Sequence, residues 1–302
     1  ALTIGSDGYP VIAYHDFTND LLKIAKCNDL ACIGQDELIS IVDGIDSNVG
    51  RFASIEIGLD GFPVISYFDD SVQSLKIAKC NDAACSDGNQ IITKPDNSNN
   101  AVGLYTSLAI GTDGFPVVSY IDQTGGDLKI IKCNDPACLG NNEIITMPDG
   151  MAEFLNGQTS IAIGTDGFPV ISYSDVSTDQ LKVMKCNDPA CAGGNETITV
   201  VDDLKDEFPN DLGHHSSLAI GMDGFPIISY IDRNPNVLKV VKCFDDSCSD
   251  VDRQISVLVQ DNEFPAQTSI AIGSDGFPMI TYSNLIAETE ALILIKCNDS
   301  DC

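Results

Sequence analysis

The stretch SLAIGTDGFPVVSYIDQTGGDLKIIKCNDPACLGNNEIITMPD, residues 107–149, recurs in variant form six times along the 302-residue chain. Its Asp-Gly dipeptide begins at Asp7, Asp60, Asp113, Asp166, Asp223 and Asp275, at spacings of 53, 53, 53, 57 and 52 residues. Self-similarity at a nearly fixed period indicates a repeat architecture. One unit therefore has to be explained, and the other five follow from it.

Each unit contains four short strand candidates separated by turn signals. In the quoted unit they are residues 107–111, 115–121, 127–133 and 143–147, rich in β-branched and aromatic residues. Four strands in roughly 40 to 55 residues are typical of a β-propeller blade. The rungs of a parallel β-helix are much shorter, and one isolated small sheet cannot bury both faces. The sequence therefore predicts an all-β, six-bladed β-propeller with four-stranded antiparallel blades of about 53 residues.

The blades are predicted to form one domain over residues 1–302. Their expected bounds are 1–53, 54–106, 107–159, 160–216, 217–268 and 269–302. The last unit stops at Cys302, after its third strand, so its outer strand is lacking in this chain. The chain opens on strand-like ALTIG without Met, so we expect either further residues at a terminus or donation of a strand by another copy, head to tail.

In a propeller blade the Asp-Gly turn and the loop after the third strand lie at the same end. The opposite end carries the turn between strands two and three and the linkers between blades. These linkers vary most between repeats, and the longest contains His214 and His215. Since variable loops on a repeated scaffold usually carry binding, we expect binding at the linker end.

The net charge of −29 and a sequence pI near 4.1 exclude favourable binding to nucleic acid or anionic lipid. No apolar run of 18 residues is present, so no membrane insertion is expected. The 36 aspartates outnumber nine glutamates. Aspartate favours tight turns because its short carboxylate accepts bonds from nearby amides; divalent cations or a salty habitat would also suit this composition.

Twelve cysteines form six local pairs, each following the third strand of its unit. The pairs are Cys27 with Cys32, Cys80 with Cys85, Cys133 with Cys138, Cys186 with Cys191, Cys243 with Cys248, and Cys297 with Cys302. Structural zinc needs four ligands and each loop offers two; the C-x-x-C redox spacing is absent. Disulfides are favoured over reduced thiols or metal ligands, which indicates an extracellular protein, secreted or on the cell surface.

The second strand of each unit ends in the pattern Tyr-x-Asp. The aspartates are Asp16, Asp69, Asp122, Asp175 and Asp232, with Asn284 in the sixth unit. Their carboxylates could bind Ca²⁺, or each could cap the turn that follows it. Counting back from that turn, the tyrosine of units one to five should face a lysine across the hairpin, as Tyr120 faces Lys129. The aromatic residue after each Asp-Gly is expected to wedge between blades.

The motifs SIAIGTDGFPVISYSD and LKVMKC of the fourth unit, and their counterparts in all six, resemble the sialidase-like (BNR-type) repeat propellers of secreted bacterial proteins. The likeness spans essentially the whole chain and implies the fold, not an activity. A sialidase needs three converging arginines, and this chain has only Arg51, Arg233 and Arg253, the last near an outer strand. The sialidase catalytic residues are therefore lacking, and the resemblance fails where catalysis would reside.

The sequence favours a non-catalytic structural or recognition module over an enzyme, with no required cofactor and Ca²⁺ as the candidate metal. The expected partners are glycan, a cell-surface protein, or copies of itself in a filament or surface layer. Two alternatives stay open: a lectin-like glycan-binding module, and a hydrolase or lyase of polysaccharide with its site at the channel mouth. Asn195 and Asn298 lie in N-glycosylation sequons beside the cysteine loops.

Overall fold

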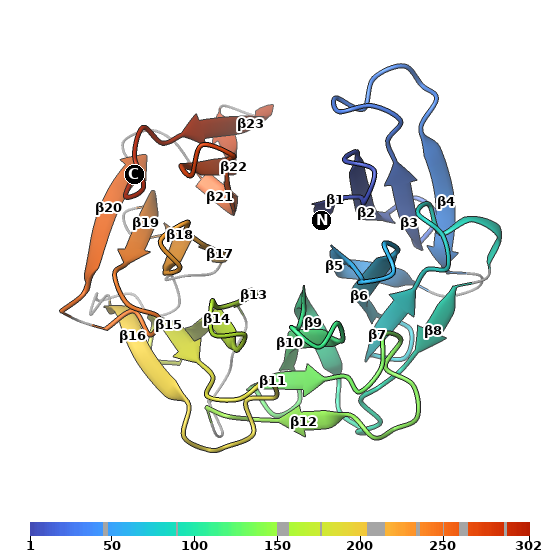
Figure 1. Ribbon diagram of the computed structural model, residues 1–302, viewed down its shortest axis with the longest axis horizontal. Helices are drawn as coiled ribbons and strands as arrows, with labels where there is room; N and C mark the ends of the chain where they lie inside the picture. Colours follow the sequence, from blue (N-terminus) through green and yellow to red (C-terminus); the bar gives the residue numbers. More distant parts are fainter. Residues whose placement is uncertain are drawn as a thin grey trace. The chain divides into compact units, whose positions relative to one another are not determined.

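The computed structural model describes the chain except residues 45–47, 89, 150–156, 176, 204–214, 234–235, 250, 260–264 and 287–288. The side chains at 87, 285, 286, 289 and 290 are not described either. The chain divides into two compact units, Ala1–Met147 and Pro148–Cys302. Each unit contains three β-sheets, and each sheet is built from one sequence repeat (Figure 1).

Unit 1 holds blades 1 to 3, whose strands follow one another in the sheet in sequence order. Blade 1 comprises β1 (Leu2–Ile4), β2 (Pro10–Asp16), β3 (Leu21–Lys26) and β4 (Leu38–Asp43). Blade 2 comprises β5 (Val49–Ile57), β6 (Pro63–Asp69), β7 (Ser74–Lys79), the short 3₁₀ turn η1 (Ser86–Gly88) and β8 (Ile91–Thr93). Blade 3 comprises β9 (Val102–Ile110), β10 (Pro116–Asp122), β11 (Asp127–Lys132) and β12 (Ile144–Thr146).

Unit 2 holds blades 4 to 6 in the same order. Blade 4 comprises β13 (Thr159–Ile163), β14 (Pro169–Asp175), β15 (Gln180–Lys185) and β16 (Thr197–Asp203). Blade 5 comprises β17 (Ser217–Ile220), β18 (Pro226–Asp232), β19 (Val237–Cys243) and β20 (Arg253–Val259). Blade 6 comprises β21 (Pro265–Ile272), β22 (Pro278–Ile286) and β23 (Thr289–Lys296).

Every strand pairs antiparallel with its neighbour in sequence within its blade. In unit 1 the first strands β1, β5 and β9 contact one another in turn, and in unit 2 β13, β17 and β21 do the same. The predicted fold class, a six-bladed β-propeller whose last sheet has three strands, is confirmed. That the six blades form one domain stays a prediction. No helix in the described part of the chain is long and apolar enough to cross a membrane.

The first hairpin of each blade is closed by the Asp-Gly turn. In blade 3 the amide of Gly114 donates to the carbonyl of Gly111 at 2.8 Å, and the amide of Gly111 donates to the carbonyl of Phe115 at 2.9 Å. Gly114 has φ of +83°, the left-handed conformation that a β-carbon disfavours. A β-carbon there would also displace the end of the exposed Leu59 side chain of the neighbouring turn. Glycine is therefore required by the backbone of the turn.

The second hairpin has the predicted register. Tyr14, Tyr67, Tyr120, Tyr173 and Tyr230 lie opposite Lys23, Lys76, Lys129, Lys182 and Lys239, and Tyr282 lies opposite Ile293. The tyrosine and lysine of a pair point to the same face of the sheet, because opposed residues of an antiparallel pair share a face. In blades 2, 3, 5 and 6 the tyrosine of this face packs in one hydrophobic cluster with the preceding blade.

The hydrophobic core lies between successive blades rather than inside one sheet. Leu75 and Ile77 of β7 are fully buried in one cluster with Val118 and Tyr120 of β10 and Ile131 of β11. Corresponding clusters join blades 1 and 2, 4 and 5, and 5 and 6. Blades 2 and 5 are thus each buried on one face against the blade before them and on the other against the blade after them.

Candidate functional site

Each Asp-Gly turn carries the same ion pair. In blade 3, Oδ1 of Asp113 accepts the amide N–H of Phe115 at 3.1 Å, and Oδ2 lies 2.8 Å from Nζ of Lys132. Lys132 is buried, donates to the carbonyl of Cys133 at 2.8 Å, and lies 5.2 Å from the centre of the Phe115 ring. The aromatic residue therefore packs beneath a lysine of its own blade, an arrangement that the wedge prediction did not anticipate.

Two of these turns, in blades 5 and 6, enclose a cavity of about 320 Å³ within unit 2. We call it the Asp-Gly cleft. Its walls include Asp223, Ile227, Lys242, Asp275, Phe277 and Ser300. The two carboxylates come from equivalent places in adjacent blades, and Ser300 comes from the last cysteine loop. A concave site with an aromatic wall and a few convergent polar groups is the usual form of a small-ligand site.

Both cleft carboxylates are held by lysines. Asp223 lies 2.6 Å from Nζ of Lys242, and Asp275 lies 2.7 Å from Nζ of Lys296. Burial raises the pKa of Asp223, but the bonds from Lys242 and the Phe225 amide outweigh it, so the pKa lies below its usual range. The bond from Lys296 is the main cause of the lowered pKa of Asp275. Both groups are ionised at neutral pH and accept hydrogen bonds; neither is suited to be a general acid.

Blade 5 departs from the repeat beside this cleft. The other five cysteine loops have an asparagine directly after the first cysteine, as at Asn134. The side-chain amide of Asn134 donates to the carbonyl of Asn142. Blade 5 has Phe244 instead, and Nζ of Lys242 lies 5.8 Å from the Phe225 ring and 5.9 Å from the Phe244 ring. The change from CNDPAC to CFDDSC was the signal in the sequence that could have identified this blade.

A second departure from the repeat lies on the first strands of blades 1 and 2. Thr3 and Glu56 stand where the other four repeats have alanine, as at Ala109. Oγ1 of Thr3 donates a long hydrogen bond of 3.5 Å to Oε2 of Glu56. Burial raises the pKa of Glu56, and the Ile57 amide and Thr3 lower it only in part. This carboxyl is therefore the candidate proton donor on the described innermost strands.

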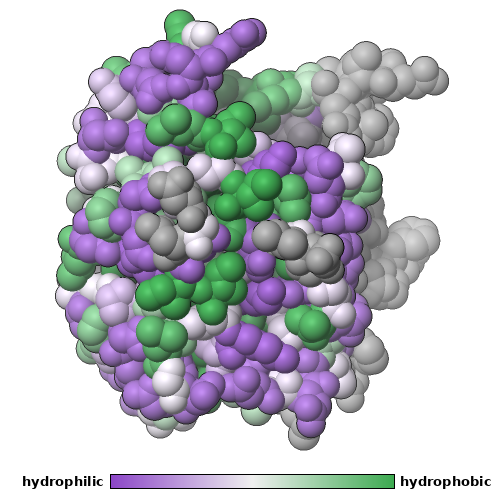
Figure 2. All heavy atoms as spheres, turned by 90° about the vertical axis from the view of Figure 1, so that its right-hand side faces the viewer, coloured by the Kyte–Doolittle hydropathy of each residue, from purple (hydrophilic) through white to green (hydrophobic). Residues whose placement is uncertain are grey.

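A second cavity, of about 340 Å³, lies between blades 1 and 2 near their outer strands. Ile41, Asp43, Gln90 and Ile92 belong to its lining. The outer strands also expose apolar side chains, among them Leu38 and Ile39 of β4 and Ile91 of β8. Figure 2 shows apolar patches separated by polar side chains on the side of the molecule it faces. The cavity has one ionisable wall residue, Asp43, which belongs to the network described next.

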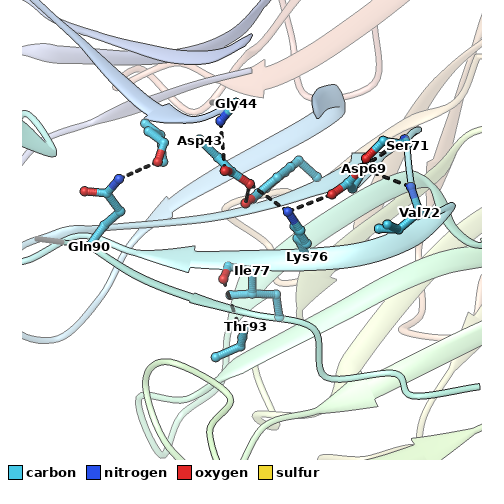
Figure 3. A network of polar contacts seen from close by, with 11 residues as sticks. Asp43, Gly44, Asp69, Ser71, Val72, Lys76, Ile77, Gln90 and Thr93 are labelled. Carbon is cyan, nitrogen blue, oxygen red and sulfur yellow. Dashed lines mark hydrogen bonds and ion pairs between the residues drawn. The ribbon is translucent and has the colours of Figure 1, made fainter. Parts of the chain in front are cut away.

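The Tyr-x-Asp aspartates belong to a polar network between blades. Oδ1 of Asp69 accepts the amides of Ser71 and Val72 in the following turn, and Oδ2 lies 2.6 Å from Nζ of Lys76 (Figure 3). Lys76 also donates to Asp43 at 3.0 Å, at the end of the outer strand of blade 1. Oδ2 of Asp43 accepts the hydroxyl of Tyr67 as well, at 2.7 Å. The network thus joins one blade to the next.

The same network occurs three more times. Asp96 joins Tyr120 and Lys129, Asp149 joins Tyr173 and Lys182, and Asp202 joins Tyr230 and Lys239. Burial, reinforced by Asp43, raises the pKa of Tyr67 and keeps its hydroxyl a donor. Burial opposes the charge on Lys76, but Asp69 and Asp43 outweigh it and raise its pKa. The sequence analysis did not predict any of the four aspartates that join neighbouring blades, which are Asp43, Asp96, Asp149 and Asp202.

The predicted Tyr-x-Asp aspartates pair with the lysine of the same hairpin, the one that lies opposite the tyrosine. Four of them also accept amides of the following turn: Asp16, Asp69, Asp122 and Asp175. The fifth, Asp232, pairs with Lys239. These contacts are those of a turn cap. Among the residues that the structure describes, no three His, Cys, Asp or Glu side chains are grouped so that they could hold a metal ion. A calcium site at these aspartates stays a prediction, and so does modification at the exposed Asn195 and Asn298.

All six predicted disulfides are present. Each closes the loop after the third strand, and the aspartate within the loop accepts its amides, as Asp135 accepts those of Ala137 and Leu139. Arg253 begins the outer strand β20 and donates to the carbonyl of Cys248 at 3.3 Å, as expected of an arginine outside any catalytic cluster. His214 lies outside the described residues.

No protein-family profile matches the chain, and no curated protein matches it significantly. Solved structures do. A protein of unknown function from Dyadobacter fermentans matches with TM-score 0.68 and 12% identity, over 97% of this chain and 92% of that one. The GH93 α-L-arabinofuranosidase of Fusarium graminearum, solved with arabinobiose, matches with TM-score 0.63 and 12% identity, over 98% and 91%. The polysaccharide lyase Uly1 matches with TM-score 0.58 and 9% identity, over 98% and 77%.

At these identities the likeness shows the fold, a β-propeller shared with enzymes of several glycoside hydrolase groups and a lyase. It does not assign a reaction to this chain, because one scaffold carries many functions.

Proposed function

We propose that this protein is a non-catalytic recognition module that binds a neutral glycan in the Asp-Gly cleft. The observation that carries the proposal is the pair Asp223 and Asp275, two ionised carboxylates facing one cavity beside the ring of Phe277. Carboxylates accept hydrogen bonds from sugar hydroxyls, Ser300 can donate or accept one, and an aromatic ring offers an apolar face.

The charge balance favours a neutral ligand. Each carboxylate of the cleft is matched by a lysine at hydrogen-bond distance, so the site itself carries little net charge. The chain as a whole carries −29, which repels polyanions approaching from solution. A neutral polysaccharide is not repelled by this net charge, whereas an acidic polysaccharide is.

The six disulfides support a place outside the reducing cytosol, where such a module would meet glycans on a cell surface or in the medium. The sialidase-like type of repeat remains part of this proposal and supports the same location. Fold likeness to a structure holding arabinobiose makes arabinan a reasonable first probe.

The test is isothermal titration calorimetry with linear arabinan oligosaccharides, other neutral polysaccharide fragments, and alginate as the acidic comparison. The variant Asp275→Asn should lower the affinity for the neutral ligand roughly tenfold or more, because the amide loses the ionised acceptor. Asp60→Asn is the matched control: it removes the same ion pair, with Lys79, from a turn outside the cleft. Equal losses in the two variants, or binding to alginate alone, would contradict the proposal.

A polysaccharide-acting enzyme is the second candidate, and Glu56 is the observation that favours it. Its raised pKa and its place on an innermost strand suit a proton donor, and the fold is shared with glycoside hydrolases and a lyase. If the chain releases new reducing ends or unsaturated products, Glu56→Gln should reduce the rate by about 10²-fold or more. Asp275→Asn should leave that rate unchanged, which separates the two candidates.

A further inference from the structure

The lysine of the Asp-Gly turn is bonded differently in blade 5 from its counterparts in blades 1 to 4. Those four pair with the turn aspartate and also donate to the carbonyl of the following cysteine, at 2.7 to 2.9 Å; they are Lys26, Lys79, Lys132 and Lys185. Lys242 lies 2.6 Å from Asp223, but beyond this ion pair its Nζ has no hydrogen-bond partner in the described part of the chain. A lysine ammonium group has three N–H donors, so donors of Lys242 are left free.

The difference accompanies a change in the backbone of blade 5. In blades 1 to 4 the third strand ends at the lysine, whereas β19 continues through Cys243, which pairs with Arg253 of β20. The rings of Phe225 and Phe244 are centred 5.8 Å and 5.9 Å from Nζ of the lysine. Aromatic rings attract a cation, but they are weaker hydrogen-bond acceptors than the carbonyl oxygen that serves the other lysines.

The free donors lie at a wall of the Asp-Gly cleft. Lys242 is 2% exposed and lies opposite Ile227, on the face of blade 5 that packs against blade 6. Both residues line the cavity, and all of its lining belongs to unit 2. A buried donor without an acceptor is costly, so a ligand that brings an acceptor to Lys242 gains more than it would at an exposed lysine.

The rest of the cavity restricts the chemistry of that acceptor. Asp223 and Asp275 are ionised, so they repel an anionic acceptor and need donors from the ligand. Much of the remaining wall is apolar and includes Ile272 and Phe277. An acetamido group meets all three conditions without a charge, because it has a carbonyl acceptor, an N–H donor and a methyl group.

We propose that the Asp-Gly cleft selects a neutral glycan built from N-acetylated amino sugars, and that Lys242 determines this specificity. The acetamido carbonyl accepts a hydrogen bond from Lys242, its N–H donates to one of the two cleft carboxylates, and its methyl group contacts the apolar wall. This inference rests on the proposed glycan recognition at the same site and names the class of sugar.

Isothermal titration calorimetry on the whole chain compares two neutral tetramers, one of β-1,4-linked N-acetylglucosamine and one of β-1,4-linked glucose, which has a hydroxyl in place of each acetamido group. The wild type should bind the acetylated tetramer roughly tenfold more tightly or better. Lys242→Met removes the donors and keeps an unbranched side chain, so the two affinities should become about equal. Lys79→Met removes the corresponding lysine from a turn outside the cleft and should keep the preference.

Saturation-transfer-difference NMR with the acetylated tetramer uses the wild type alone, so it tests the proposal even if Lys242→Met does not fold. The acetamido methyl protons should receive more saturation than the sugar-ring protons, because the methyl group contacts the apolar wall. Stronger transfer to the ring protons would overturn the proposal, and so would equal affinity of the wild type for both tetramers or a preference that persists in Lys242→Met. Glycan recognition would still stand if Asp275→Asn weakened the binding of either tetramer. If no neutral glycan binds, the proposed function itself fails.

Discussion

At the scale of single residues, the buried tyrosine hydroxyl of the second strand carries the contact between blades. In blade 2, Tyr67 is fully buried and donates to Asp43 of the preceding blade at 2.7 Å. Lys76 completes the arrangement by bonding Asp43 and Asp69. A buried charge is costly unless its partners are all present. The four copies of this network therefore specify which face of a blade meets which.

Replacing Tyr67 with phenylalanine should destabilise the protein by about 1–3 kcal/mol, since it removes the donor and leaves part of the acceptor capacity of Asp43 buried and unmet. Tyr14→Phe is the matched control. Tyr14 occupies the same place in blade 1, and its hydroxyl makes no hydrogen bond within the described part of the chain. Urea unfolding of both variants measures the difference. Equal free energies of unfolding for the two variants would contradict this role for the hydroxyl.

Half of this network could be predicted from the sequence. The Tyr–Lys pairs followed from counting residues back from a short turn, which fixes the register of a hairpin. Asp43 was missed because it reaches the network from a different blade. A signal existed: Asp43, Asp96 and Asp149 each precede their tyrosine by 24 residues. A repeat period shows what recurs, and a contact between repeats needs the packing to be known.

At the scale of elements, the cysteine loop combines a cross-link with a backbone that side chains rarely adopt. The second cysteine of every loop has a positive φ, for example 52° at Cys138. Asp135 supports the same loop by accepting two of its amides. The cross-link was evident from the spacing of the cysteines. The left-handed backbone was not, because cysteine gives no indication of it.

Removing one disulfide by Cys133→Ala/Cys138→Ala should cost about 2 kcal/mol in the free energy of unfolding, the chain-entropy value for closing so short a loop. The pair Cys133→Ala/Cys138→Gly should recover up to about 1 kcal/mol of this, because glycine adopts a positive φ without strain. Chemical denaturation of both variants under the same oxidising conditions checks the order. If the alanine variant is the more stable one, the backbone strain inferred for this loop is wrong.

The strands themselves were predictable because alternation and turn residues are local properties, and the cleft was not, because it forms where two blades meet. Asp223 and Asp275 looked like ordinary turn residues in the sequence, and within their own turns they are. Only the packing of blade 5 against blade 6 gives them a common cavity. That binding lies on the linkers between blades stays a prediction, and linker residues 150–156 and 204–214 lie outside the described ranges.

At the scale of the whole molecule, the few basic residues are used inside the protein. The chain has 16 Lys and Arg against 45 Asp and Glu. Lysines of the network between blades, such as Lys129, and lysines of the Asp-Gly turns, such as Lys132 above the Phe115 ring, are buried against aspartates. The excess carboxylates are left to the surface, where they keep copies apart at low salt.

These buried ion pairs predict that the free energy of unfolding is constant at intermediate pH and falls at both low and high pH. The folded pKa of Asp69, Asp122 and Asp175 is lowered: burial acts to raise it, but the lysines and turn donors outweigh burial. Their contribution is present above the unfolded value of about 3.9 and is lost as the pH falls through the lowered pKa. Lys76, Lys129 and Lys182 have a raised pKa because their aspartates outweigh desolvation. Their contribution is present below about 10.4 and is lost as the pH rises through the raised pKa.

The urea midpoint measured from about pH 2 to pH 12 should therefore be level between about pH 5 and 9 and fall on both sides. Glu56 and Asp127 act the other way on the acid side, because burial raises their pKa and stabilises the protonated form, but they are two groups against many. Asp69→Asn should lower the urea midpoint at intermediate pH. It should also make the fall of the midpoint at acid pH less steep, because the variant lacks one carboxylate whose protonation is linked to unfolding. An equally steep fall at acid pH in this variant, with the midpoint at intermediate pH lowered, would show that Asp69 stabilises the blade contact through its turn bonds rather than through its charge.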